Sequence, residues 1–247
     1  MSVDPAARRD VPLDLAAAEP RAAHRRWREF LRHWGLVVAI SAGALSILAD
    51  LGEDVFDHAP GTFDAGVRAW ALAHHAPGLT TAFEVITRVG APPLVVLLAV
   101  LVAVWLWRAH ARHVAAVVVA APTIAVVIFN VVKQIIHRTR PAGGLLLRDV
   151  TFSFPSGHAT ASAAVFGTLA WVLAREGKMP WAVAVALAVL CPLLIGLSRV
   201  YLDVHWATDV VGGWCAGAAV AALSAGVYER GRRRAHPADG RARRPNA

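Results

Sequence analysis

The sequence has few of the residues that build metal sites and disulfide scaffolds. Its only two cysteines, Cys191 and Cys215, lie inside apolar runs, without the spacing of a zinc site or a disulfide framework. We therefore interpret both as small core residues. No carboxylate cluster suited to Mg²⁺ and no His/Cys spacing suited to Zn²⁺ occurs in the sequence. The sequence therefore predicts no bound metal and no other cofactor.

Two further absences bear on the class of protein. Residues 1–29 are polar and contain no short apolar h-region of the kind found in a cleavable signal peptide. The net charge is +8, but no nucleic-acid motif is present and the basic tails flank hydrophobic segments. We therefore expect no nucleic-acid partner. Charged residues make up only 17% of the chain and gather at its ends and in short connectors, a pattern typical of polytopic membrane proteins.

Hydrophobic residues are abundant, at 57% of the 247 residues. Six apolar segments are each close to the ~17–25 residues that cross ~30 Å of hydrocarbon as an α-helix. We therefore expect an all-α fold, a bundle of six transmembrane helices. The sixth span carries a ridge of small residues, Gly213, Gly217 and Ala221, which predicts close packing against another helix. The expected spans are 34–51, 91–107, 114–132, 158–174, 181–197 and 207–228.

The longer segment between the first two spans, residues 52–90, carries Phe63, Val67 and Trp70 at helical spacing. This spacing predicts an amphipathic helix over 63–75. The helix either lies at the membrane interface, with Trp70 as an anchor, or covers the bundle as a short packed helix.

Basic residues predict the orientation of the spans. With six spans both termini lie on one side, and that side receives 18 of the 25 Lys and Arg residues. Because the side richer in these residues is cytoplasmic, we expect both termini to lie in the cytoplasm. We expect residues 1–29 and 230–247 to be disordered basic tails on either side of a membrane domain at 30–229. The ends of spans three and five and the beginnings of spans four and six then share the outer face.

Three polar clusters interrupt the apolar sequence at those four points. As templates they are K-x6-R-P, P-S-G-H and S-R-x5-H-x3-D, spread over 77 residues from Lys133 to Asp209. Their members are Lys133, Arg140 and Pro141 in the first, Pro155, Ser156, Gly157 and His158 in the second, and Ser198, Arg199, His205 and Asp209 in the third.

The cations of these clusters suit an anion. Lys133, Arg140 and Arg199 fall at one membrane level, beside the N-termini of spans four and six, where unpaired N–H groups and the helix dipole attract negative charge. A dianionic phosphate matches this arrangement. Taken singly, Lys133 is also compatible with snorkelling, Arg140 with a helix stop before Pro141, and Arg199 with an interface anchor.

The second cluster also resembles an ordinary helix start, with a Ser N-cap after a proline. We expect this cap to aim the Ser156 hydroxyl and the Gly157 amide at the anion, with His158 facing the same pocket. His205 and Asp209 are four residues apart and share a helix face. The carboxylate can fix the imidazole tautomer and leave one nitrogen as a nucleophile, although a simple His–Asp capping pair has the same spacing.

Three further polar residues, His137, Arg138 and Asp149, lie close to the clusters in sequence. They could contact a second phosphate or a lipid head group, or be solvated in the outer loops. We favour the solvated position.

The three clusters, in this order and spacing, resemble the motifs of the type 2 phosphatidic acid phosphatase (PAP2) superfamily. The resemblance implies a fold for residues 30–229 and a metal-independent phosphatase. It implies that His205 attacks phosphorus to form a phosphohistidine, that Asp209 orients it, and that His158 protonates the leaving group. The same resemblance implies that the phosphoryl oxygens are bound by Lys133, Arg140, Ser156, Gly157 and Arg199.

The spans and the resemblance together indicate a multi-pass lipid phosphatase of a bacterial plasma membrane, with its site on the extracytoplasmic face. The expected partners are the bilayer and a lipid phosphate, with undecaprenyl diphosphate favoured over phosphatidic acid and phosphatidylglycerol phosphate. A transporter, or a lipid-binding relative without activity, is the alternative from another class. A transporter predicts ionisable residues through the membrane depth, whereas here they gather at one face.

Overall fold

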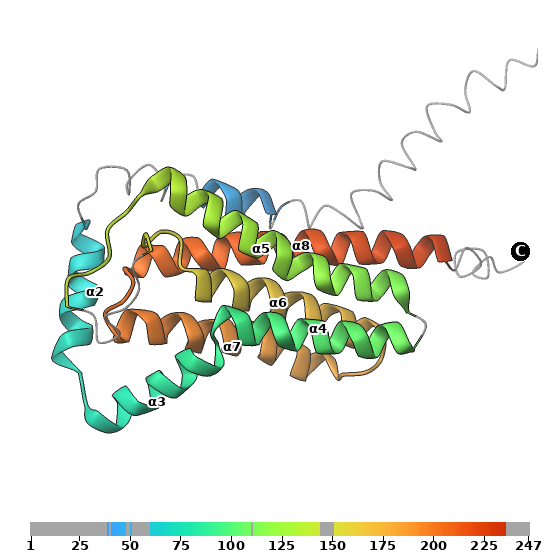
Figure 1. Cartoon of the computed structure of the whole chain (residues 1–247), viewed down its shortest axis with the longest axis horizontal. Coiled ribbons are helices and arrows are strands. Elements are labelled where there is room, and N and C mark those ends of the chain that lie inside the picture. The colour runs from blue at the N-terminus through green and yellow to red at the C-terminus, as the bar shows by residue number, and fades with distance from the viewer. Residues whose placement is uncertain are drawn as a thin grey trace, which may run out of the picture. The chain divides into compact units, whose positions relative to one another are not determined.

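The computed structural model describes residues 39, 41–47, 50, 60–109, 111–143 and 151–235. The regular elements in these ranges are α-helices, which confirms the all-α prediction (Figure 1). The helices whose two ends both lie in these ranges are α2 (Thr62–Ala73), α3 (Pro77–Val89), α4 (Pro92–Arg108), α5 (Arg112–Ile136), α6 (Gly157–Arg175), α7 (Trp181–Tyr201) and α8 (Ala207–Ala235).

Four of the predicted spans correspond to single helices, α5 to α8, that are long and apolar enough to cross a membrane. The span predicted at 91–107 corresponds to α4, which has 17 residues. Helix α4 joins α3 through a bend of 47°, and together they make a fifth candidate span. The first predicted span, 34–51, lies partly outside the described residues, so the count of six is not confirmed. The tail at 1–29 lies wholly outside them.

Helix α6 is the central helix of the bundle. It packs against α4, α5, α7 and α8, and 72% of its apolar stretch is buried, compared with 28% in α7. Its sequence explains this position, because most of its residues are Ala, Gly, Ser or Thr, and small residues let neighbouring helices approach closely. The Thr160 and Ser162 hydroxyls donate to carbonyls of their own chain, so burying them leaves neither donor unsatisfied.

Helices α6 and α8 approach each other closely. A Cβ atom built at Gly213 would lie 2.8 Å from the Ser156 carbonyl oxygen, and one built at Gly217 would lie 2.5 Å from the Thr160 carbonyl oxygen. The predicted ridge of small residues is therefore confirmed as a packing surface. Its effect is to bring the beginning of α8 against the beginning of α6.

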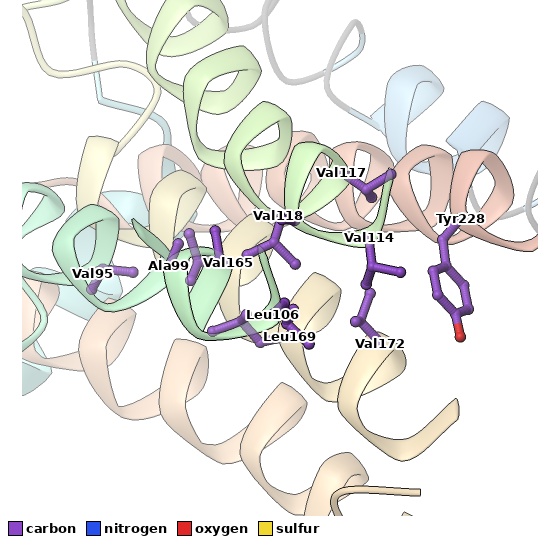
Figure 2. Packing of buried hydrophobic residues seen from close by; sticks show 12 residues of the cluster. Val95, Ala99, Leu106, Val114, Val117, Val118, Val165, Leu169, Val172 and Tyr228 are labelled. Carbon is purple, nitrogen blue, oxygen red and sulfur yellow. The ribbon is translucent and has the colours of Figure 1, made fainter. Parts of the chain in front are cut away.

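Larger apolar side chains fill the space between α4, α5, α6 and the far end of α8 (Figure 2). The outward faces of α4, α5 and α7 expose further Leu and Val side chains, as a surface in contact with hydrocarbon requires. The buried set labelled in Figure 2 comprises Val95, Ala99, Leu106, Val114, Val117, Val118, Val165, Leu169, Val172 and Tyr228.

Helix α2 lies across one end of the bundle and packs against α7 and α8 (Figure 1). Its Asp64 side chain is buried, whereas Phe63 and Trp70 are exposed. A helix is therefore present where the sequence predicts an amphipathic one, starting one residue earlier and ending two earlier. A position at the membrane interface stays a prediction.

The α6–α8 contact predicts a difference between two glycine substitutions. We expect Gly217→Ala to lower the apparent Tm of the detergent-purified protein, because overpacking a tight contact costs ~1–3 kcal/mol. Gly66→Ala is the matched control, since a Cβ there meets nothing within 4 Å and alanine favours a helix by ~1 kcal/mol over glycine. Its Tm should be unchanged or higher. Equal Tm changes in the two variants would contradict this view of the packing.

Candidate active site

The four points that the sequence places on one face meet at the end of the bundle where α5 and α7 end and α6 and α8 begin (Figure 1). A backbone hydrogen bond joins the second and third motifs, in which the Ser156 N–H donates to the Asp209 carbonyl at 2.9 Å. The Lys133 ammonium group of the first motif donates to the carbonyls of Phe152 and Ser153, just before the second motif. The three motifs therefore form one cluster.

His205 and Asp209 are in contact, as their spacing predicts. His205 Nδ1 lies 3.2 Å from Asp209 Oδ2, and Arg140 Nη1 lies 3.1 Å from His205 Nε2. A guanidinium group only donates hydrogen bonds, so Nε2 accepts one and carries no proton. The proton therefore sits on Nδ1 and is donated to the carboxylate. This tautomer makes the Nε2 lone pair the nucleophilic position of the ring.

The surroundings of His205 keep its ring neutral. Burial lowers the pKa of His205 to about 3, which outweighs the opposite effect of the hydrogen bond to Asp209. The positive charges of Arg140 and Arg199 lower it further. The imidazole is therefore uncharged at neutral pH and stays so well below the ordinary histidine value of 6.5. A neutral ring is the form that can attack phosphorus.

His158 lies in the first turn of α6 and is half-buried. Its ring lies near the backbone of Thr87, close to the end of α3, and within electrostatic range of Arg199 and His205. A ring nitrogen in this position can exchange a proton with a group bound between the two histidines.

Uncharged oxygens are among the groups that orient the two motif arginines. Arg140 donates from Nε to the Thr151 carbonyl at 2.8 Å and from Nη1 to the Val204 carbonyl at 2.7 Å. Arg199, which is buried, donates from Nη1 to the Thr87 hydroxyl at 2.9 Å. Each of these contacts fixes the position of a guanidinium group.

Ser156 occupies the N-cap position of α6 that the sequence predicts, with the helix beginning at Gly157. The serine side chain makes no capping hydrogen bond to its own helix, and its aim at an anion stays a prediction. Its backbone N–H anchors it to α8 instead, and its buried hydroxyl has no hydrogen-bond partner among the described residues. The N–H groups that begin α6 keep the anion-binding capacity of a helix N-terminus. A Cβ at Gly157 would approach the Phe129 ring to 3.3 Å, so this position fits glycine best.

Arg138 does not have the solvated loop position that its place in the sequence favours. Its side chain is only 3% exposed. It donates from Nη1 to Asp209 Oδ1 and from Nη2 to Asp64 Oδ2, both at 2.7 Å. Two buried carboxylates compensate for the cost of burying its charge. The one sequence signal for this role was a second arginine two residues before Arg140.

Three other residues at the site were not identified from the sequence. Ser153 donates a hydrogen bond to Asp209 Oδ2, Thr87 contacts both His158 and Arg199, and Asp64 binds Arg138. None belongs to a recognisable spacing pattern. The other two polar residues close to the motifs in sequence are His137 and Asp149. His137 is exposed, in agreement with the solvated position expected for it, and Asp149 lies outside the described residues.

The arrangement therefore brings together a neutral imidazole, whose Nε2 lone pair accepts a hydrogen bond from Arg140, and a second imidazole. Arg140 and Arg199 lie within electrostatic range of both rings, and Lys133 binds the Ser153 carbonyl beside them. These are the parts needed to bind a phosphate-like dianion and to transfer its phosphoryl group. Within the described part of the chain, no group of three or more His, Cys, Asp and Glu residues is placed to hold a metal ion.

Comparison with known proteins agrees with this chemistry. Residues 114–233 match the sequence model of the PAP2 superfamily. Phosphatidylglycerophosphatase B of Bacillus subtilis is 38% identical over 108 residues, which are 41% of this chain and 51% of that protein. An undecaprenyl-diphosphatase of Sulfolobus acidocaldarius is 32% identical over 126 residues, 49% of this chain and 58% of that protein. The chain thus spans about half the length of the curated relatives it matches.

The fold also matches a solved structure, the crystal structure of a transmembrane PAP2 type phosphatidylglycerolphosphate phosphatase from Bacillus subtilis. The TM-score is 0.64 at 26% identity, over 78% of this chain and 96% of that one. The resemblance to the PAP2 superfamily that the motifs indicate is therefore confirmed.

Proposed function

We propose that this chain, whose residues 114–233 match the PAP2 superfamily, is an integral membrane phosphatase that hydrolyses a phosphomonoester or diphosphate of a membrane lipid. The observation that carries the proposal is the state of His205. The His205 Nδ1–H donates a hydrogen bond to Asp209, and the Nε2 lone pair of the same ring accepts one from Arg140. The ring lies at the end of the bundle where the helices bearing the other motif cations also end. This geometry supplies a nucleophile inside a phosphate-binding cradle.

The reaction proceeds in two displacements. His205 Nε2 attacks phosphorus, the bond from phosphorus to the leaving oxygen breaks, and His158, protonated on both ring nitrogens when the phosphate dianion is bound, gives one proton to that oxygen. The His205 proton stays on Nδ1 and is donated to the Asp209 carboxylate, which stabilises the positive charge that forms on the ring. A water molecule then attacks the phosphohistidine, His158 accepts its proton, and the P–N bond breaks. Inorganic phosphate leaves and His205 is neutral again.

Arg140 must change partner during the first displacement. Its Nη1 donates to the Nε2 lone pair in this structure, and that lone pair has to be released before it can attack. A phosphate dianion attracts a guanidinium group more strongly than a neutral nitrogen does. Substrate binding therefore turns Arg140 towards a phosphoryl oxygen and exposes the nucleophile. Lys133 and Arg199 stabilise the charge on the remaining oxygens, so no metal ion is required.

The substrate belongs to the lipid phosphates, because the site lies at one end of a bundle whose outer faces are apolar. The relatives differ in the lipid that their names specify. The match with 38% identity and the solved structure both concern phosphatidylglycerophosphate, whereas the match with 32% identity concerns undecaprenyl diphosphate. We therefore rank phosphatidylglycerophosphate first, which reverses the order favoured from the sequence, and undecaprenyl diphosphate second.

Phosphate release from a panel of lipids tests this function. We expect the detergent-purified protein to release phosphate from phosphatidylglycerophosphate or undecaprenyl diphosphate at an undiminished rate in EDTA. Vanadate, which mimics five-coordinate phosphorus, should inhibit it. His205→Ala is the matched control and should release none. The proposal fails if the wild type hydrolyses neither of these lipids nor phosphatidic acid, and metal independence fails if EDTA stops turnover and Mg²⁺ restores it.

The roles of the two histidines predict different dependences on the leaving group. His158→Ala should lose about 10²–10⁴-fold in the rate on a lipid phosphate, the usual contribution of a general acid. With p-nitrophenyl phosphate, whose leaving group scarcely needs a proton, it should still form phosphoenzyme. His205→Ala should form none, and Asp209→Asn should be slow on both substrates. Alkaline-quench trapping measures the phosphoenzyme. Trapping in His205→Ala but not in His158→Ala would reverse the two roles.

The orientation of the site predicts a labelling pattern in cells. The positive-inside distribution indicates an extracytoplasmic site and cytoplasmic termini. In a variant without Cys191 and Cys215, Ala142→Cys should react with a membrane-impermeant thiol reagent on intact cells. Lys178→Cys, in the exposed turn after α6, should react only after lysis. The opposite pattern would place the site in the cytoplasm.

A further inference from the structure

A buried arginine links the nucleophile to a helix outside the region matched by the superfamily. Arg138 lies between two carboxylates, with Nη1 at 2.7 Å from Asp209 Oδ1 and Nη2 at 2.7 Å from Asp64 Oδ2. All three side chains are buried. Asp64 comes from α2, 50 residues before residue 114, where the superfamily match begins.

Asp64 also holds the first turn of α8. Its Oδ1 accepts a hydrogen bond from the Thr208 N–H at 2.9 Å, and its Oδ2 accepts one from the Thr208 hydroxyl at 2.7 Å. The same hydroxyl accepts from Arg138 Nη1 at 2.7 Å. Asp64 therefore caps α8 from a distant helix. Thr208, which it caps, immediately precedes Asp209.

The two carboxylate oxygens of Asp209 have different hydrogen-bond partners. Oδ1 faces Arg138, whereas Oδ2 accepts from His205, from Ser153 and from the Trp206 N–H. A guanidinium group bound to Asp209 alone would draw the negative charge of the carboxylate towards Oδ1 and away from the imidazole. With Asp64 on its other nitrogen, Arg138 shares its charge between two carboxylates. Asp209 then keeps more of its charge for the Nδ1 proton of His205.

We propose that Asp64 is a positioning residue for the His205 nucleophile, acting through Arg138, Thr208 and Asp209. The proposal rests on the phosphatase function above. It goes beyond that function in assigning a part of the active site to α2, the helix that lies across the end of the bundle (Figure 1). Asp64 does not touch the substrate; it sets the orientation and charge of the group that orients the nucleophile.

The chain contains a matched control for the docking of α2. One helical turn after Asp64, Arg68 forms a second ion pair, with Nε at 2.7 Å from Asp203 Oδ1 and Nη2 at 2.8 Å from Asp203 Oδ2. Asp203 is buried, as Asp64 is. This pair also fixes α2 to the bundle, but it belongs to the connection before α8 and not to the hydrogen bonds of Asp209. Asp203→Asn therefore measures α2 docking without the link to the nucleophile.

The test compares Asp64→Asn with Asp203→Asn in full-length detergent-purified protein, using lipid phosphate hydrolysis and alkaline-quench trapping. Asparagine keeps the shape and one acceptor oxygen of Asp64 but removes its charge. We expect kcat and the rate of phosphoenzyme formation to fall about 10- to 100-fold in Asp64→Asn, the loss expected for one hydrogen bond to a charged group. KM should change little, because the phosphate-binding residues are intact. Asp203→Asn should keep both values close to wild type.

A second comparison separates positioning from general destabilisation. In an Asp209→Asn background, Asp64→Asn should cause almost no further loss of kcat, because its effect passes through Asp209. Additive losses, equal losses in Asp64→Asn and Asp203→Asn, or an unchanged kcat in Asp64→Asn would each overturn the proposal. If Asp64→Asn does not fold, Thr208→Val replaces it in the test and should also lower kcat. An unchanged kcat in Thr208→Val would then overturn the proposal. A wild type that releases no phosphate would refute the phosphatase function instead.

Discussion

The close approach of α6 and α8 determines the geometry of the site. Glycine at 213 lets the α8 backbone lie against the Ser156 carbonyl, where any Cβ would come within 2.8 Å. This contact allows the Ser156 N–H to reach the Asp209 carbonyl and thus joins the second and third motifs through the backbone. Glycine packing keeps together the beginnings of the two helices that position His158 and His205. A wider helix separation would move the proposed acid and the proposed nucleophile too far apart to act on one phosphate.

Around this contact, Arg138 differs from the residues proposed to bind the phosphate. Arg138 binds two carboxylates and is buried with them, which suits it to hold Asp209. Arg140 instead contacts the His205 ring itself, through Nε2. Arginines two residues apart in sequence thus have different roles.

The sequence predicts the helices and the convergence of the motifs well, because both follow from hydrophobic length and alternation across a membrane. Helices α4 to α7 begin within two residues of their expected starts. Arg138 and Asp64 were not predicted, because their role depends on a contact between residues 74 positions apart. Burial of a loop arginine has no periodic signal in the sequence. Ser156 is the N-cap of α6, as predicted, but local spacing does not show that its backbone N–H binds another helix.

The proposed reaction depends most directly on which nitrogen carries the phosphoryl group. The hydrogen bonds of His205 assign Nδ1 to Asp209 and leave Nε2 for attack. Proteolysis of the alkaline-quenched phosphoenzyme, with mass spectrometry to locate the modified residue and ³¹P NMR to identify the isomer, measures this assignment. The predicted result is a single phosphohistidine, at Nε2 of His205. A phosphoryl group on Nδ1 of His205, or on His158, would contradict the account.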